Sequence, residues 1–145
     1  MAGVVSVMIA VVIGVPFEQD LRLARTRCAH CGAINPPYGH VNSFDRRRLE
    51  SLFAPLLAAR VEHVASTREG TNAVSDLLMR VAGYPWGSSD QEEPCIACGG
   101  SIGPAPRRSG VAKILSALAV RLDRVLATTR PAKPKWLHVV FAKEF

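Results

Sequence analysis

The chain uses all four of its cysteines in two matched motifs, CAHCG at residues 28–32 and CIACG at residues 95–99. In each motif two residues separate the thiols, and a glycine directly follows the second cysteine. A thiolate pair at this spacing can grip one tetrahedral metal ion from a tight turn, and the glycine permits the turn that points backbone N–H groups at the sulfurs. Two such turns supply the four soft ligands that zinc prefers. The sequence therefore predicts one structural zinc ion, held by Cys28, Cys31, Cys95 and Cys98.

The two motifs, Cys28-Ala-His-Cys31-Gly and Cys95-Ile-Ala-Cys98-Gly, resemble the paired knuckles of the zinc-ribbon and rubredoxin-like class. This resemblance implies a structural four-cysteine site and no particular family. The chain departs from the usual pattern because 63 residues separate Cys31 from Cys95, whereas the usual gap is about 15–20 residues. We therefore expect the residues between the motifs to form an insertion whose two ends are tied together by the metal.

Other uses of the same cysteines remain open. A thioredoxin-like redox motif is one, because Arg27 and His30 beside the thiols would lower a thiol pKa, although the motif should then open a helix. Disulfides of an exported protein share the even cysteine count, but we find no export signal. Iron uses the same ligands as zinc. His40, which follows Cys31 by nine residues, is an alternative ligand.

The N-terminal segment, residues 1–17, is apolar and uncharged, with the sequence AGVVSVMIAVVIGVPF after the first methionine. Its odd-numbered positions from Val5 to Val15 are all β-branched, which is typical of a strand. Small residues at period four favour a membrane helix instead, but the run is shorter than the roughly 18–20 residues that a spanning helix needs. We expect a buried strand over residues 4–15; a membrane or targeting segment and a buried soluble helix are the alternatives.

Three apolar stripes with helical spacing follow, over residues 49–64, 74–81 and 111–126. Pro55 interrupts the first stripe, so that it predicts either a kinked helix or two helices. Gly83 is placed to end the second helix in a left-handed turn. The predicted N-terminal caps are Asn42 or Ser43 for the first helix, Thr71 for the second and Ser109 for the third.

The C-terminal sequence WLHVVFAKEF predicts a strand with Leu137, Val139, Phe141 and Phe145 on one face. A basic extended linker at residues 130–135 precedes it, and we expect the two terminal strands to pair. The predicted fold class is α+β, with a predominantly helical centre inserted between two zinc knuckles and strands at the N- and C-termini. Residues 1–145 are expected to form a single zinc-stabilised domain.

Nothing in the sequence indicates a catalytic site. The chain carries no phosphate-binding loop, no G-x-S-x-G motif and no H-E-x-x-H motif. A catalytic zinc keeps an open coordination position, whereas four cysteines fill the shell. The sequence GHV at residues 39–41 resembles an HNH-type nuclease turn only faintly, and the acidic and asparagine partners are missing. We therefore expect a non-enzymatic protein without a small-molecule substrate.

The net charge of +6 favours anionic partners and is unevenly spread. Residues 21–60 hold seven Lys/Arg and two acidic residues, and residues 105–145 hold nine Lys/Arg and two acidic residues, whereas residues 61–104 are acidic. Metal closure would bring the basic segments beside Cys28 and Cys98 toward one another as one anion-binding surface. The candidate contacts are Arg22, Arg25, Arg27, Arg46, Arg47, Arg48, Arg107, Arg108, Lys133 and Lys135.

Two functions fit these features. The first is a nucleic-acid-associated regulatory factor that contacts DNA or RNA through the basic residues. The second is a zinc-stabilised adaptor, or a subunit of a larger complex, that binds an acidic protein partner, and self-association is open in either case. Cysteines kept as metal-bound thiolates are typical of a reducing compartment, so we expect an intracellular protein of the cytoplasm or nucleus. We do not expect a membrane partner.

Overall fold

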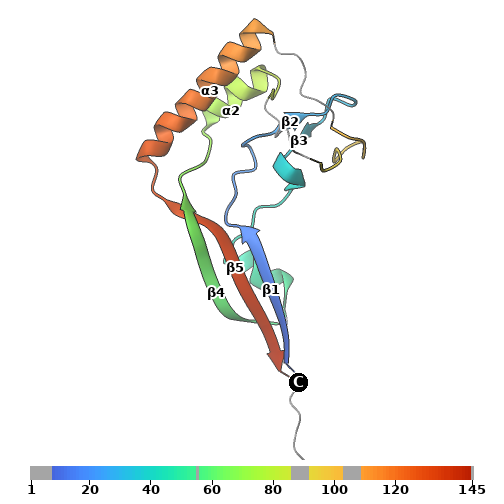
Figure 1. Cartoon of the computed structure of the whole chain (residues 1–145), viewed down its shortest axis with the longest axis vertical. Coiled ribbons are helices and arrows are strands. Elements are labelled where there is room, and N and C mark those ends of the chain that lie inside the picture. The colour runs from blue at the N-terminus through green and yellow to red at the C-terminus, as the bar shows by residue number, and fades with distance from the viewer. Residues whose placement is uncertain (1–7, 55, 86–91, 103–108, 145) are drawn as a thin grey trace, which may run out of the picture. The chain divides into compact units, whose positions relative to one another are not determined.

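The computed structural model describes residues 8–54, 56–85, 92–102 and 109–144. Within them the fold is mixed α and β, with three α-helices and two small sheets (Figure 1). The chain divides into two compact units, each built from segments that are far apart in the sequence. Unit 1 comprises Met1–Gln19, Ser43–Thr67 and Ala132–Phe145, and unit 2 comprises Asp20–Asn42 and Arg68–Pro131.

Unit 1 contains a three-stranded antiparallel sheet in the order β1-β5-β4, in which β1 spans Met8–Pro16, β5 spans Lys133–Glu144 and β4 spans Leu57–Thr67. Figure 1 shows β1 in blue beside β5 in red. The predicted N-terminal strand is confirmed over residues 8–15, and so is its pairing with the C-terminal strand. It is not the buried strand that the sequence predicts, because β1 lies at the edge of the sheet and residues 10–15 are half-buried or exposed. The helical alternatives for this part of the segment are wrong, while residues 4–7 lie outside the described residues.

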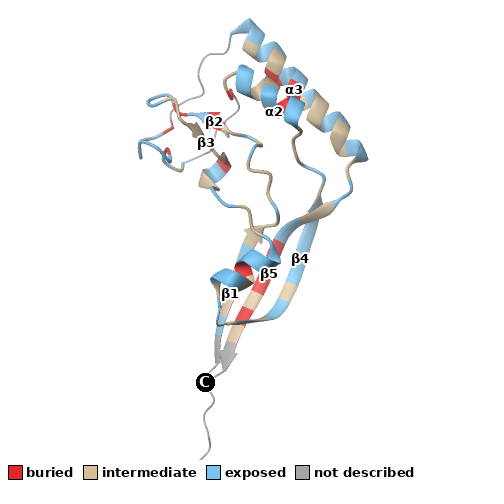
Figure 2. Cartoon of the chain, turned by 180° about the vertical axis from the view of Figure 1, so that it is seen from behind, coloured by how far each residue is buried: buried red, intermediate tan, exposed pale blue. Residues whose placement is uncertain are grey.

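The core of unit 1 lies on one face of this sheet. Leu137, Val139 and Phe141 of β5 have no exposed surface, and Leu49 of α1 (Arg46–Leu52) covers them with 1% of its own surface exposed (Figure 2). Odd-numbered residues of β1 pack against this cluster, whereas Val12 on the opposite face is 71% exposed. The period-two alternation that predicts both strands therefore also identifies their buried face.

The predicted helix over residues 49–64 is wrong in its second half, because the chain from Leu57 to Thr67 forms β4. Helix α1 ends at Leu52, and its N-cap is Asp45 rather than Asn42 or Ser43. Pro55 itself lies outside the described residues. In β4, which pairs with β5, Ala58 and Val61 pack against the core, and this tertiary contact overrides the local helical spacing. A predominantly helical centre between the knuckles is therefore not confirmed.

Unit 2 contains α2 (Ala73–Val81) and α3 (Gly110–Thr129). Ser109 caps α3 as predicted, whereas the cap of α2 is Asn72 rather than Thr71. Gly83 follows α2 with a φ of +81°, which confirms the predicted left-handed turn. The basic linker is shorter than predicted, because β5 already begins at Lys133. No helix in the described part of the chain is long and apolar enough to cross a lipid bilayer.

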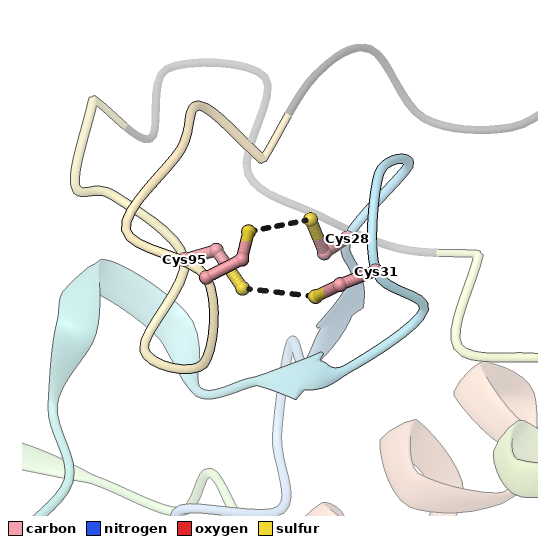
Figure 3. Close-up of side chains that lie close together, drawn as sticks. Cys28, Cys31 and Cys95 are labelled. Atoms are coloured by element: carbon pink, nitrogen blue, oxygen red, sulfur yellow. Dashed lines mark hydrogen bonds between the residues drawn. The ribbon is translucent and has the colours of Figure 1, made fainter.

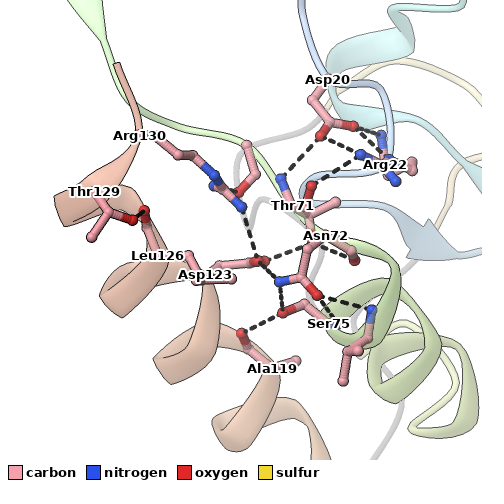
Figure 4. Close-up of polar contacts among 12 residues, drawn as sticks. Asp20, Arg22, Thr71, Asn72, Ser75, Ala119, Asp123, Leu126, Thr129 and Arg130 are labelled. Carbon is pink, nitrogen blue, oxygen red and sulfur yellow. Dashed lines mark hydrogen bonds and ion pairs between the residues drawn. The ribbon is translucent and has the colours of Figure 1, made fainter. Parts of the chain in front are cut away.

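Hydrogen bonds fix α2 and α3 against each other in an antiparallel arrangement (Figure 4). The Ser75 hydroxyl donates to the Ala119 carbonyl at 3.2 Å, and the Asn72 amide donates to the Asp123 carboxylate at 2.9 Å. Asn72 contacts Asp123, and the later residue Ser75 contacts the earlier residue Ala119, so the two helices run in opposite directions. Ser75, Ser116 and Ala119 are fully buried at this contact, and such small residues let the two helices approach closely.

The start of α2 is tied to the chain around Asp20 by a polar network (Figure 4). The Asp20 carboxylate accepts hydrogen bonds from the Arg22 guanidinium at 2.9 Å and from the Thr71 backbone N–H at 3.0 Å. Partial burial would raise the pKa of Asp20, but these hydrogen bonds and the charge of Arg22 outweigh burial and hold the pKa below its usual range. Asp20 is therefore ionised at neutral pH and holds the segment that leads into the first cysteine motif.

Candidate metal centre

The four cysteine sulfurs gather in one cluster within unit 2 (Figure 3). The Sγ atoms of Cys28 and Cys98 are 3.9 Å apart, those of Cys31 and Cys95 are 3.6 Å apart, and all four lie within 4.8 Å of one another. Four sulfurs placed tetrahedrally at the Zn–S distance of about 2.3 Å would be about 3.8 Å apart. All four cysteines are free, so the disulfide alternative is wrong for this structure. The cluster has the size of a tetrahedral metal site.

The two motifs adopt the same backbone turn, which the sequence predicts from their matched spacing. In each, the N–H of the first cysteine donates to the carbonyl five residues later, and the N–H of the glycine donates back to the carbonyl of that cysteine. Both glycines that follow the second cysteine have positive φ, +74° at Gly32 and +70° at Gly99, so they adopt a conformation that other residues rarely reach. The knuckle-like turns that the resemblance implies are therefore present on both sides of the cluster.

Each turn places its first cysteine inside and its second outside. Cys28 and Cys95 are 1% and 2% exposed, whereas Cys31 and Cys98 are exposed. Ile102 packs against the two buried cysteines, and its carbonyl accepts a hydrogen bond from the Ala29 N–H at 3.0 Å. The chain after the second turn therefore closes over the first turn, and one side of the cluster is shielded from water.

The protein environment favours the thiolate at Cys95. The backbone N–H groups of Ala97 and Cys98 donate to its sulfur, and together with Asn35 they lower the pKa of Cys95 to about 6. At Cys31 the N–H of Ala33 favours the thiolate, but contacts with the other thiols and desolvation outweigh it and raise the pKa of Cys31 to about 12. A cation bound by the four sulfurs would stabilise all of them as thiolates.

Asn35 links the two turns and was not identified by the sequence analysis. It lies in β3 (Ile34–Asn35), which pairs with β2 (Thr26–Arg27) to frame the first motif, and it is completely buried. Its amide donates to the Ala33 carbonyl at 3.1 Å and to the Cys95 sulfur, and its carbonyl oxygen accepts the Ile96 N–H at 2.9 Å. This side chain therefore satisfies backbone groups of both turns and orients a cysteine ligand.

Replacing Asn35 with alanine is expected to weaken the centre without removing a ligand. The Ile96 N–H, whose hydrogen bond to Asn35 is part-buried, would lose its acceptor, which costs about 1 kcal/mol of folding free energy. Loss of a side chain that orients a metal ligand lowers metal affinity about 10–100-fold. Both effects can be measured by urea denaturation and by competition with a zinc chelator. Ile96→Ala is the control, because it removes a side chain that is 56% exposed and keeps the N–H. Equal effects of the two variants would contradict this role.

Among the described residues, the group that could hold a metal comprises the four cysteines and no histidine. His30 is exposed within the first turn, and the ring of His40 lies 6.0 Å from that of Tyr38. His40 is thus not part of this four-cysteine group. The thioredoxin-like alternative requires a helix at the cysteine motif, but the first motif is followed by β3.

The ten residues predicted to bind anions are divided between the two units, and two of them lie outside the described residues. In unit 2, Arg22, Arg25 and Arg27 donate to groups of the chain itself, including the carboxylate of Asp20 and the Leu21 and Gly32 carbonyls. Arg107 and Arg108 lie outside the described residues. The single surface that would join them to Arg22, Arg25 and Arg27 therefore stays a prediction.

The other candidates lie in unit 1. The first turn of α1 contains the three consecutive arginines Arg46, Arg47 and Arg48. Arg46 forms an ion pair with Glu50 at 2.6 Å, and Arg48 donates to the Ser43 carbonyl at 3.1 Å. Lys133 donates to the Glu18 carbonyl at 2.7 Å. Arg47 and Lys135 are exposed.

Comparison of the chain with family models, with curated proteins and with solved structures gives no match.

Proposed function

We propose that this chain is a non-enzymatic binding protein in which one zinc ion, held by Cys28, Cys31, Cys95 and Cys98, stabilises the fold of unit 2. The observation that carries the proposal is the cluster of four cysteine sulfurs, all within 4.8 Å of one another and with two pairs at 3.6 and 3.9 Å. Four protein ligands complete the shell of a tetrahedral ion and leave no position for a substrate or water, which is typical of a structural site. Zinc has no redox chemistry and prefers such thiolate ligands, so it suits a structural role better than iron.

Native mass spectrometry beside denatured mass tests this proposal. We expect the folded chain to carry one zinc ion, and the mass difference to disappear when the protein is denatured in acid, because protonated thiols release the metal. Elemental analysis of the same sample distinguishes zinc from iron. A folded chain without metal, or a chain loaded with iron, would overturn the assignment.

The surface of unit 2 favours a protein as the binding partner. Helices α2 and α3 expose seven large apolar side chains, which we call the α2/α3 face: Val74, Leu77, Val81, Val111, Ile114, Leu118 and Val125. Surfaces of monomeric proteins rarely gather so many apolar side chains on neighbouring elements without a partner. This observation supports the adaptor, or subunit of a larger complex, as the function.

A nucleic-acid-associated regulator is the alternative, and it rests on the net charge of +6. Six of its ten candidate contacts, namely Arg22, Arg25, Arg27, Arg46, Arg48 and Lys133, donate to acceptors within the chain. Such side chains have fewer free donors for phosphate, so we prefer the adaptor. Affinity for random DNA or RNA that falls steeply as the salt concentration is raised would reverse this preference.

A further inference from the structure

Strand β1 lies at one edge of the sheet in unit 1, so its outer side has no neighbouring strand in the part of the chain that the structure describes (Figure 1). It pairs with β5 over nine residues in an unbroken register, and none of these residues is charged. A long, regular, apolar edge of this kind pairs readily with another strand. The outer side of β1 is therefore a candidate interaction surface.

Two hydrogen bonds just beyond β1 show which way its backbone groups point. The Phe17 N–H donates to the Lys135 carbonyl at 3.0 Å, in the register that continues the pairing of β1 with β5. The Glu18 N–H points the other way and donates to the Phe44 carbonyl at 2.8 Å. Because the direction alternates along an antiparallel strand, odd-numbered residues of β1 bond to β5 and even-numbered residues point outward. Three residues in the middle of the strand carry these outward N–H and carbonyl groups: Ala10, Val12 and Gly14.

The opposite edge of the same sheet has features that β1 lacks. Strand β4 carries the exposed charged residues Arg60 and Glu62, which form an ion pair with each other. Its register with β5 also shifts between Ala58 and Arg60, as at a β-bulge. Charges and bulges on an edge strand hinder its pairing with a further strand. The β4 edge is therefore protected against strand addition, whereas the β1 edge is open to it.

Strand β1 is complementary to a second copy of itself. In an antiparallel pair centred on Val12, the outward groups of Val12 meet those of the same residue in the second copy, and Ala10 meets Gly14. Val11 then lies opposite Ile13, so the core side of one sheet continues into the core side of the other. Both residues pack against the core of unit 1 but are only half-buried, because no strand covers their outer side. Neighbouring β-branched side chains of this kind stabilise a strand pair.

We propose that two copies of this chain associate through β1, in antiparallel pairing centred on Val12, to form one six-stranded sheet. The second copy places apolar residues opposite apolar residues on the core side and brings no charged side chain to the contact. The assembly is closed, because the two edges that remain free are the charged and bulged β4 strands. This association goes beyond the proposed function, since it concerns unit 1 and does not depend on the metal in unit 2.

Sedimentation velocity of the full zinc-loaded chain tests the association. We expect a species of twice the chain mass at high protein concentration that dissociates on dilution. In hydrogen exchange, the Val12 N–H should exchange slowly in the dimer and faster on dilution, whereas the Ile13 N–H, which points to β5, should exchange slowly in both states. A monomer at every concentration would leave the edge to a strand of another protein and overturn the proposal, as would a series of larger oligomers.

Exchanging charges at Val12 tests the register of the pair. Val12 is 71% exposed, so Val12→Lys and Val12→Glu should each keep the fold of unit 1. Each variant alone should associate at least about fivefold more weakly than the wild type, because two like charges lie directly opposite each other. An equimolar mixture should associate more tightly than either variant alone, because the opposed charges then differ in sign. A mixture that associates no better than its components would contradict pairing centred on Val12.

Three further variants separate pairing along the edge from stacking of two sheets face to face. Val12→Pro removes an outward N–H and keeps the hydrogen bonds to β5, so it should abolish the dimer in a strand that still tolerates proline. Val12→Ala keeps the N–H and should change the association little. Val64→Lys adds a charge on the same face of the sheet but at the β4 edge, where Val64 lies opposite Trp136 and is 39% exposed, and should leave the dimer intact. Loss of the dimer in Val64→Lys would assign the association to that face and overturn the proposal.

Discussion

Cys95→Ser is expected to abolish metal binding and to unfold unit 2. Cys95 is 2% exposed, and its sulfur accepts hydrogen bonds from two backbone N–H groups and from Asn35. A structural zinc contributes roughly 10–16 kcal/mol of apparent binding free energy near neutral pH, whereas the whole stability of a domain is about 5–15 kcal/mol. A bound metal would also tie together the two ends of the long loop between Cys31 and Cys95. The free energy lost with the metal is therefore expected to equal or exceed the folding free energy of unit 2.

The measurement is far-UV circular dichroism together with zinc content, for the variant and for the wild type treated with a chelator. Both should lose the helical signal of α2 and α3, and the chelated wild type should recover it when zinc is returned. His30→Ala is the control, because His30 lies in the same turn but is exposed and outside the cluster. A metal-free wild type that keeps its helical signal and its cooperative urea transition would contradict this prediction.

The elements that the sequence predicts well are those whose patterns depend on neighbouring residues alone. The β-branched alternation of the N-terminal segment and the matched alternation around Val139 predict β1 and β5 and their buried faces, because period two is a local property of a strand. The two cysteine motifs predict their own turns, since Gly32 and Gly99 are required by the backbone at those positions. Ser109 and the stripe that follows it predict α3.

The elements that the sequence misses depend on contacts between distant residues. Leu57, Val61 and Val64 have spacings that suit a helix, yet they form β4 because that segment pairs with β5, more than sixty residues away along the chain. Asn35 belongs to the metal centre only because the fold brings Ile96 beside it. Neither contact leaves a local pattern that sequence reasoning could detect.

The sequence also does not predict which contacts the individual basic and apolar side chains make. An arginine in the sequence counts as a candidate for phosphate, but Arg22 and Arg27 use their donors on groups of the chain itself. Similarly, the apolar residues of α3 include some that pack within unit 2 and others, such as Leu118 and Val125, that are exposed. Small residues such as Ala119, rather than the largest ones, form the helix contact, and only the structure separates the two.

The largest effect expected in unit 1 is that of Phe141→Ala. Phe141 has no exposed surface, lies on the central strand opposite Val11 of β1 and Ala58 of β4, and stacks on Phe53 with ring centroids 5.1 Å apart. Truncation of a buried phenylalanine costs about 3–5 kcal/mol, because it removes apolar contacts and leaves a cavity. The loss should be large here, since the surrounding residues come from β1, β4 and the chain after α1 and cannot all move inward together.

Urea denaturation followed by tryptophan fluorescence measures this effect in a Trp86→Phe background, in which Trp136 on the same strand is the remaining tryptophan. Phe141→Leu should cost less, because it keeps most of the side-chain volume. Val12→Ala is the matched control, since Val12 is 71% exposed on the other face of the sheet and its truncation should change the free energy of unfolding by less than about 0.5 kcal/mol. If Phe141→Ala and Val12→Ala destabilised the protein equally, the core would not lie on the face that the odd-numbered residues of β1 and β5 form.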